Sequence, residues 1–192
     1  MNITTPAIVD RIDFALTMTG AIVAGITEPD LAEPSLCAGW DLRTELNHLV
    51  GGMRIFAAEL THTDPGGAHH DDWLGANPQA AFTTAATLDR AAWHRPDALD
   101  TTIRLGFGPV PGPLGALIHL TEVLVHGIDL AVTTNQQHLI DEPASAHLLT
   151  TVRAMDFDTF RRPGLFDPQH PAPANAAVHQ QLLAFMGRSH VD

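Results

Sequence analysis

The chain has 192 residues, of which 45% are hydrophobic, and it carries a net charge of −12 and one cysteine. This length suits one compact domain, which we expect to cover residues 1–192. The negative charge argues against nucleic acid or a membrane as a partner, and the absence of lysine and tyrosine excludes Schiff-base and phenolic catalysis. The N-terminus lacks the basic stretch of a signal peptide, and a lone Cys37 suits a reducing compartment, so we expect a cytoplasmic protein.

Apolar residues recur at helical spacing in six segments, which cover about residues 5–26, 41–61, 77–93, 112–134, 143–160 and 176–186. Asp41 and Asn77 are typical helix N-cap residues, and Gly187 suits the position just after the last helix. One short strand is predicted at residues 101–105. The pattern predicts an all-α fold, most simply a four-helix bundle with one or two additional short helices.

The segment 112–134 is mostly apolar, yet it contains a stripe of polar side chains. His119, Glu122, His126 and Asp129 fall within an arc of roughly 80° at helical spacing. Glu122 and His126 are one turn apart on the same face. Burying such groups costs several kcal/mol unless they are paired or bound. A divalent metal ion would satisfy them, and a hydrogen bond between Glu122 and His126 explains the pair equally well.

A metal site needs a further ligand from another helix, and His48 is one candidate. It lies about 120° from the centre of the apolar face of its helix, so periodicity does not select it. Gly51 and Gly52 follow it, and glycines inside a helix suggest the close approach of another helix or a ligand. The simpler interpretation of His48 is a surface histidine beside a packing glycine.

Two other sets of polar residues receive a structural interpretation. The run from His69 to Asp72 offers several ligand atoms, but adjacent loop residues rarely both reach one ion. We therefore predict a solvated or lid segment there. Cys37 has no base beside it in the sequence, so we interpret it as a small buried hydrophobe rather than a nucleophile or a thiolate ligand.

The sequence resembles the mycothiol-dependent maleylpyruvate isomerase N-terminal domain family in two signatures, LCAGWDLRTELNHLVGG and HLTEVLVHGIDLA. Other stretches, such as DDWLGANPQAAF, resemble the single-domain members called mycothiol transferases, and the similarity covers nearly the whole chain. This resemblance implies a DinB/YfiT-like four-helix bundle with a divalent metal in its interior. It implies His48, Glu122 and His126 as the metal ligands, with supporting roles for His119 and Asp129.

The resemblance further implies a metal-dependent thiol S-transferase. In it Zn²⁺, or alternatively Ni²⁺, Mn²⁺ or another divalent ion, would activate mycothiol for attack on an electrophilic small molecule. The isomerase's C-terminal extension is absent, which argues against isomerase activity itself. Two alternatives stay open: a metal-dependent hydrolase on the same site, and a non-catalytic metal- or ligand-binding bundle. The expected partners are the thiol and the electrophile, in a monomer or a homodimer.

Overall fold

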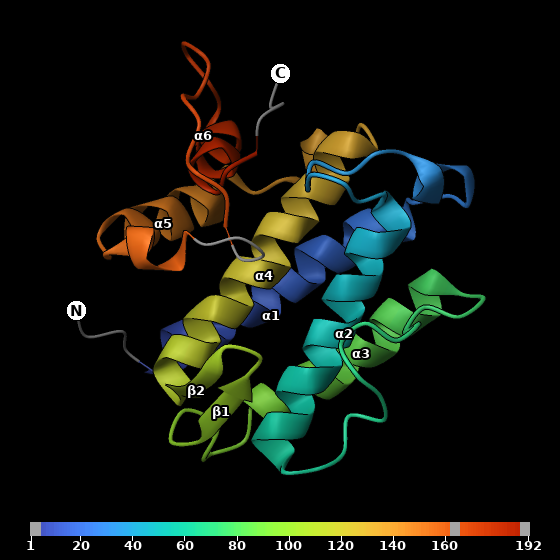
Figure 1. Cartoon of the computed structure of the whole chain (residues 1–192), viewed down its shortest axis with the longest axis vertical. Coiled ribbons are helices and arrows are strands. Elements are labelled where there is room, and N and C mark those ends of the chain that lie inside the picture. The colour runs from blue at the N-terminus through green and yellow to red at the C-terminus, as the bar shows by residue number, and fades with distance from the viewer. Residues whose placement is uncertain (1–4, 162–165, 189–192) are drawn as a thin grey trace.

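A computed structural model of the chain describes residues 5–161 and 166–188, and this part is mostly helical (Figure 1). The α-helices are α1 (Thr5–Ala24), α2 (Leu42–Thr61), α3 (Pro78–Trp93), α4 (Gly112–Thr133), α5 (Glu142–Arg153) and α6 (Val178–Phe185). Within the described residues, three short 3-10 helices lie in the connections: η1 (Pro29–Ala32), η2 (Gln137–Leu139) and η3 (Phe157–Phe160). The predicted all-α character is therefore confirmed at the level of a mainly helical chain.

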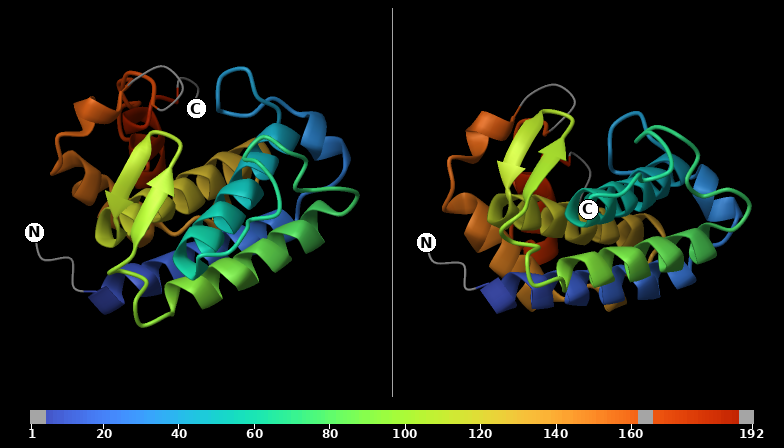
Figure 2. Two further views of the ribbon diagram at one scale, coloured as in Figure 1. Left: turned by 60° about the horizontal axis from the view of Figure 1, so that its bottom comes forward. Right: turned by 90° about the horizontal axis from the view of Figure 1, so that it is seen from below.

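The four long helices are arranged in two layers, with α1 beside α3 in one and α4 beside α2 in the other (Figure 2). Contacts also join α1 to α4 and α2 to α3, so the four helices enclose a common core. Leu46 and Met53 of α2 and Val123 and Ile128 of α4 are completely buried there. Helices α5 and α6 pack together beside α4, outside this arrangement (Figure 1).

The helix starts follow from capping side chains. The Asp41 carboxylate accepts a hydrogen bond from the backbone N–H of Thr44 at 2.8 Å, and the Asn77 side chain accepts one from Ala80 at 3.0 Å. Each acceptor satisfies a backbone donor that the first helical turn leaves free. Both predicted N-caps are thus confirmed. Gly187, predicted to end the last helix, has a φ of +91° that favours glycine.

Helix α4 lies at the centre of the fold and packs closely on α1. A Cβ atom on Gly127 would stand only 2.2 Å from Thr19 Oγ1, so this contact requires glycine. The Thr19 hydroxyl donates to the backbone carbonyl of Val123 at 3.1 Å in the same contact. By length and composition α4 could cross a membrane, but 83% of its most apolar window is buried, as in the core helix of a globular protein.

Two predicted elements differ from the structure. The single predicted strand is one half of a hairpin, in which β1 (Thr102–Leu105) pairs antiparallel with β2 (Gly108–Pro111). The sequence does not predict β2 because this strand contains two prolines, and a strand with proline is tolerated only at the edge of a sheet. The fifth helix ends at Arg153, seven residues before its predicted end at Phe160. There the chain turns so that the Phe157 ring packs 5.0 Å from Phe166 and 5.1 Å from Phe185.

Candidate metal centre

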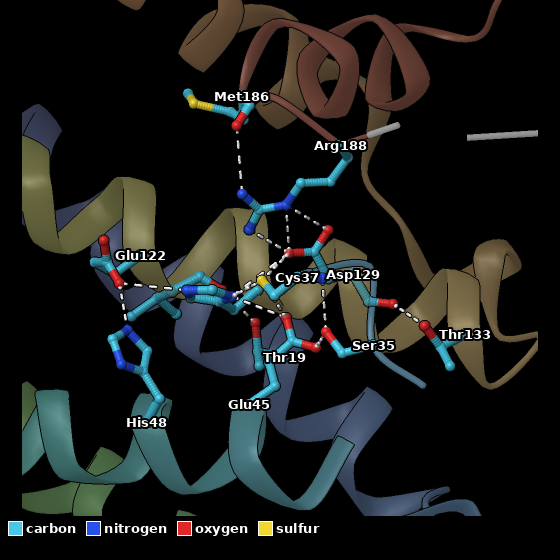
Figure 3. A network of polar contacts seen from close by, with 12 residues as sticks. Thr19, Ser35, Cys37, Glu45, His48, Glu122, Asp129, Thr133, Met186 and Arg188 are labelled. Carbon is cyan, nitrogen blue, oxygen red and sulfur yellow. Dashed lines mark hydrogen bonds and ion pairs between the residues drawn. The ribbon is translucent and has the colours of Figure 1, made fainter. Parts of the chain in front are cut away.

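The three residues predicted as metal ligands come together between α2 and α4. The Nε2 atom of His48 lies 2.9 Å from Glu122 Oε2, and His126 Nε2 lies 3.4 Å from the same oxygen. One donor atom of each residue lies within 4.8 Å of the other two. Figure 3 shows His48 on α2 pointing toward Glu122 on α4. That these residues hold an ion stays a prediction, but their convergence is a feature of the fold.

This donor set fits a divalent ion. Two imidazole nitrogens and one carboxylate oxygen are the ligands of many catalytic zinc sites. With metal–ligand bonds of about 2.0–2.2 Å, tetrahedral ligands stand about 3.4 Å apart, close to the separations between Glu122 and the two histidines. The side chains of His48 and Glu122 are 25% and 30% exposed. A further coordination position would therefore face the solvent, as a catalytic site requires.

The other ring nitrogen of His126 is directed at two buried carboxylates. Its Nδ1 atom lies 2.8 Å from Glu45 Oε1 and 3.5 Å from Asp129 Oδ2, and neither carboxylate is accessible to solvent. An N–H at Nδ1 that donates to Glu45 leaves the lone pair of Nε2 free on the side of Glu122 and His48. Glu45 therefore selects the tautomer of His126 that can bind a metal.

Glu45 was missed from the sequence, where His119 and Asp129 were the residues given supporting roles. The second carboxylate oxygen of Glu45, Oε2, accepts a hydrogen bond from Ser35 Oγ at 2.6 Å. Ser35 Oγ in turn accepts one from the backbone N–H of Cys37 at 2.8 Å. The turn before α2 thus closes over Glu45. The available signal was spacing, since Glu45 precedes His48 by three residues and shares its side of α2.

A second group of four donor residues borders the first and shares His126 with it: Cys37, Glu45, His126 and Asp129. The Cys37 sulfur lies 3.8–3.9 Å from the polar atoms of the other three. Burial raises the pKa of the Cys37 thiol, but the side chain is only half-buried and lies among polar groups, which differs from the predicted small buried hydrophobe. We favour the group that contains His48 and Glu122, because these two side chains are partly exposed, whereas Asp129 of the second group is already paired with Arg188.

Asp129 is already paired with a cation from the end of the described chain. The guanidinium of Arg188 donates to Asp129 Oδ2 through Nη2 at 2.6 Å and through Nε at 3.1 Å (Figure 3). Burial alone would raise the pKa of Asp129, but the charge of Arg188 and the hydrogen bond with His126 hold it at about 2. Asp129 thus links Arg188 to α4 beside His126, and its negative charge is balanced without a metal.

The charges around His126 favour a cation at this point. Burial alone would lower the pKa of His126, but hydrogen bonds to the surrounding carboxylates, Asp129 foremost, and to Cys37 raise it well above its ordinary value. Burial alone would likewise raise the pKa of Glu122, but hydrogen bonds with His126 and His48 hold it well below its ordinary value. In the metal-free protein a proton on His126 supplies the positive charge, which a divalent ion would replace.

Gly51 makes room for a loop rather than for a ligand. A Cβ on Gly51 would lie 2.6 Å from Trp73 Cδ1, whereas a Cβ on Gly52 would meet nothing within 4 Å. The predicted lid segment is partly confirmed as solvated, because His70, Asp71 and Asp72 are exposed, but the His69 ring packs 4.7 Å from the His48 ring. His48 is therefore half-buried under a loop instead of lying on the surface.

His119, the first residue of the polar stripe, lies outside the donor group. Its Nε2 atom is 2.6 Å from Asp89 Oδ2 of α3, and both side chains are almost fully buried. The rings of Phe56 and Trp93 pack against it at 4.5 Å and 5.6 Å. His119 is thus satisfied by a carboxylate in the core and joins α4 to α3.

Comparison with known proteins agrees with this geometry. The model of the mycothiol maleylpyruvate isomerase N-terminal domain family matches residues 15–131. The chain belongs to this family. The family is DinB-like, and the matched range contains every residue of the two donor groups, whereas Arg188 lies beyond it.

Two uncharacterized proteins of Mycobacterium tuberculosis are also similar, one from strain CDC 1551 / Oshkosh and one from strain ATCC 25618 / H37Rv. Each is 29% identical over 170 residues, which cover 88% of this chain and 91% of the relative. No solved structure matches the chain. Membership of the family supports a function related to mycothiol, and the donor groups support a metal site, without fixing the metal or the reaction.

Proposed function

We propose that this protein is a divalent-metal-dependent thiol S-transferase, built as a DinB-like four-helix bundle, that joins mycothiol to an electrophilic small molecule. The proposal rests on the convergence of His48, Glu122 and His126, whose donor atoms lie within 4.8 Å of one another. The side chains of His48 and Glu122 are partly accessible to solvent. Family membership points to mycothiol as the thiol. Zn²⁺ suits two nitrogens and one oxygen, and Ni²⁺ or Mn²⁺ are alternatives.

The bound ion would supply Lewis acidity that lowers the pKa of an incoming thiol. The chain itself contributes orientation and charge. Glu45 accepts from His126 Nδ1 and so directs the opposite nitrogen to the site. Glu122 provides the anionic ligand, and its lowered pKa keeps it ionised at neutral pH. The exposed edge of His48 and Glu122 leaves an approach for both the thiol and the electrophile.

Thiol binding is tested with Co²⁺ in place of the native metal, because a thiolate bound to Co²⁺ gives a charge-transfer absorption. The experiment uses the Cys37→Ala variant, since the Cys37 sulfur lies 3.9 Å from His126 Nδ1 and could give the same signal. Adding mycothiol should produce the absorption in this variant and not in the variant that also carries Glu122→Gln. A Co²⁺-loaded protein that shows no absorption with mycothiol would contradict the thiol-transferase reading.

Turnover is tested by offering mycothiol with a haloarene, an epoxide and an α,β-unsaturated carbonyl compound in turn. Mass spectrometry should detect an S-conjugate that forms faster with metal-loaded protein than with chelator-treated protein or Glu122→Gln. Hydrolysis of an ester without conjugation would favour the hydrolase alternative. Thiol binding without any metal-dependent conjugation across the panel would favour a binding protein.

A further inference from the structure

Asn47 of α2 holds the loop between α2 and α3 at two nearby points. The side-chain amide of Asn47 donates to the backbone carbonyl of Asp71 at 2.9 Å, and its oxygen accepts from the backbone N–H of Trp73 at 2.8 Å. The Trp73 indole N–H donates to the carbonyl of Ala68 at 3.1 Å, which holds the loop in a compact form. Asn47 directly precedes His48, so the loop is anchored beside the candidate metal centre.

The absence of a side chain at Gly51 lets this loop lie against the helix. A Cβ at Gly51 would stand 2.6 Å from Trp73 Cδ1 and 3.3 Å from the backbone oxygen of His69. Tryptophan and glycine thus fit together one turn after Asn47. The guanidinium of Arg54 lies over the Trp73 ring at 5.5 Å and adds a further contact from α2. These contacts place the part of the loop that carries His69 over His48.

Two rings from outside α2 pack against His48, one from the turn before the helix and one from the loop after it. The His69 ring stands edge-on to His48 at 4.7 Å with an interplanar angle of 84°, and the Trp40 ring lies at 5.0 Å with an angle of 52°. The other histidine of the site, His126, is oriented by the hydrogen bond from Nδ1 to Glu45. Within the described residues, His48 has a hydrogen-bond partner only at Nε2, which is Glu122. Apart from that hydrogen bond, packing against the neighbouring rings, that of His126 included, is what orients His48.

We propose that His69 is a positioning residue that, together with Trp40, holds the His48 imidazole with Nε2 directed at the metal. The inference rests on the proposed metal site and adds a residue from outside its ligand set. Among the described residues, the donor group formed by His48, Glu122 and His126 does not include His69. His69 acts through the packing of its ring against His48 and not as a ligand. Residues that orient metal ligands typically change metal affinity about 10–100-fold when they are removed.

The test measures Co²⁺ affinity by calorimetry and the d–d absorption of the bound ion, which reports its coordination geometry. His69→Ala should weaken Co²⁺ binding about 10-fold and broaden the absorption, because His48 becomes free to rotate. His69→Phe should restore both, since it keeps a ring against His48 without a nitrogen. His138→Ala is the matched control, because His138 is an exposed histidine of η2, and it should behave as the wild type.

The loop anchor provides a second, independent pair of variants. Gly51→Ala should displace Trp73 and His69 and reproduce the effect of His69→Ala on the absorption. Gly52→Ala places its Cβ in open space one residue away and should leave the metal site unchanged. Circular dichroism of both variants shows whether their helices remain folded. If Gly51→Ala does not fold, the His69 variants still test the proposal.

The outcomes separate this inference from the proposed function. If the wild type binds Co²⁺ and His69→Ala binds it with the same affinity and absorption, only the positioning role is overturned. If His69→Phe is as defective as His69→Ala, a nitrogen of His69 is required and ring packing is the wrong account. If the wild type binds no divalent ion, the proposed function fails and the inference fails with it.

Discussion

At the scale of single residues, Glu45 shows what sequence periodicity cannot reveal. In the sequence it is an acidic residue in the first turn of a helix, where a solvent-exposed carboxylate interacts favourably with the helix dipole. In the structure it is fully buried, bound to Ser35 and directed at His126. Its partners come from a preceding turn and from another helix, and only packing brings them together. Glu122 and His126, by contrast, lie one turn apart on the same helix, so the sequence alone places them side by side.

We predict that Glu45→Gln lowers divalent-metal affinity about 10–100-fold while the helical fold persists. The amide keeps the size of the side chain but removes the charge that favours an N–H at His126 Nδ1, so the metal-binding tautomer becomes less favoured. Zinc competition with a chromophoric chelator measures the change. Glu28→Gln is the control, because Glu28 is exposed and its side chain caps nothing. Equal affinities for Glu45→Gln and the wild type would show that Glu45 does not orient the ligand.

At the scale of elements, most helices were predictable because their ends carry local signals. Asp41 and Asn77 accept from backbone donors of their own first turns, so the sequence contains both partners of each cap. The end of α5 depends instead on the distant rings of Phe166 and Phe185. His48 was identified only by resemblance, because the loop that carries His69 and Trp73 buries a flank of α2 that periodicity assigns to solvent.

The contact between α1 and α4 gives a prediction about these elements. Gly127→Ala should lower the free energy of unfolding by about 1–3 kcal/mol, because the new methyl group would overlap Thr19 Oγ1. Urea unfolding followed by circular dichroism measures the change. Thr19→Ala removes the overlapping oxygen, so the double variant should be less destabilised than the sum of the two single changes. Additive effects would mean that the helices separate at this point without strain.

At the scale of the whole molecule, the metal site should link stability to pH. The pKa of His126 is raised in the folded metal-free protein, so its proton stabilises the fold. That contribution is fully present below the unfolded pKa of about 6.5 and is lost as the pH rises through the folded pKa. A metal ion must displace the same proton, so its binding is opposed in acid and favoured as the pH rises.

We therefore predict that the difference in melting temperature between zinc-loaded and chelator-treated protein grows as the pH rises from about 6 to about 8. Scanning fluorimetry in buffers that do not bind zinc measures this difference. The variant His126→Ala should show no zinc-dependent difference at any pH. A wild-type difference that is independent of pH would indicate that zinc does not compete with a proton on His126.

We expect one divalent ion to bind between α2 and α4 through His48, Glu122 and His126. A crystal structure of the zinc-loaded protein, with anomalous difference density collected at the zinc absorption edge, tests it most directly. We expect one strong peak per chain, about 2.0–2.2 Å from one nitrogen of each histidine and one oxygen of Glu122. A peak among Cys37, Glu45 and Asp129 instead, or no peak while His48 points to solvent, would contradict it.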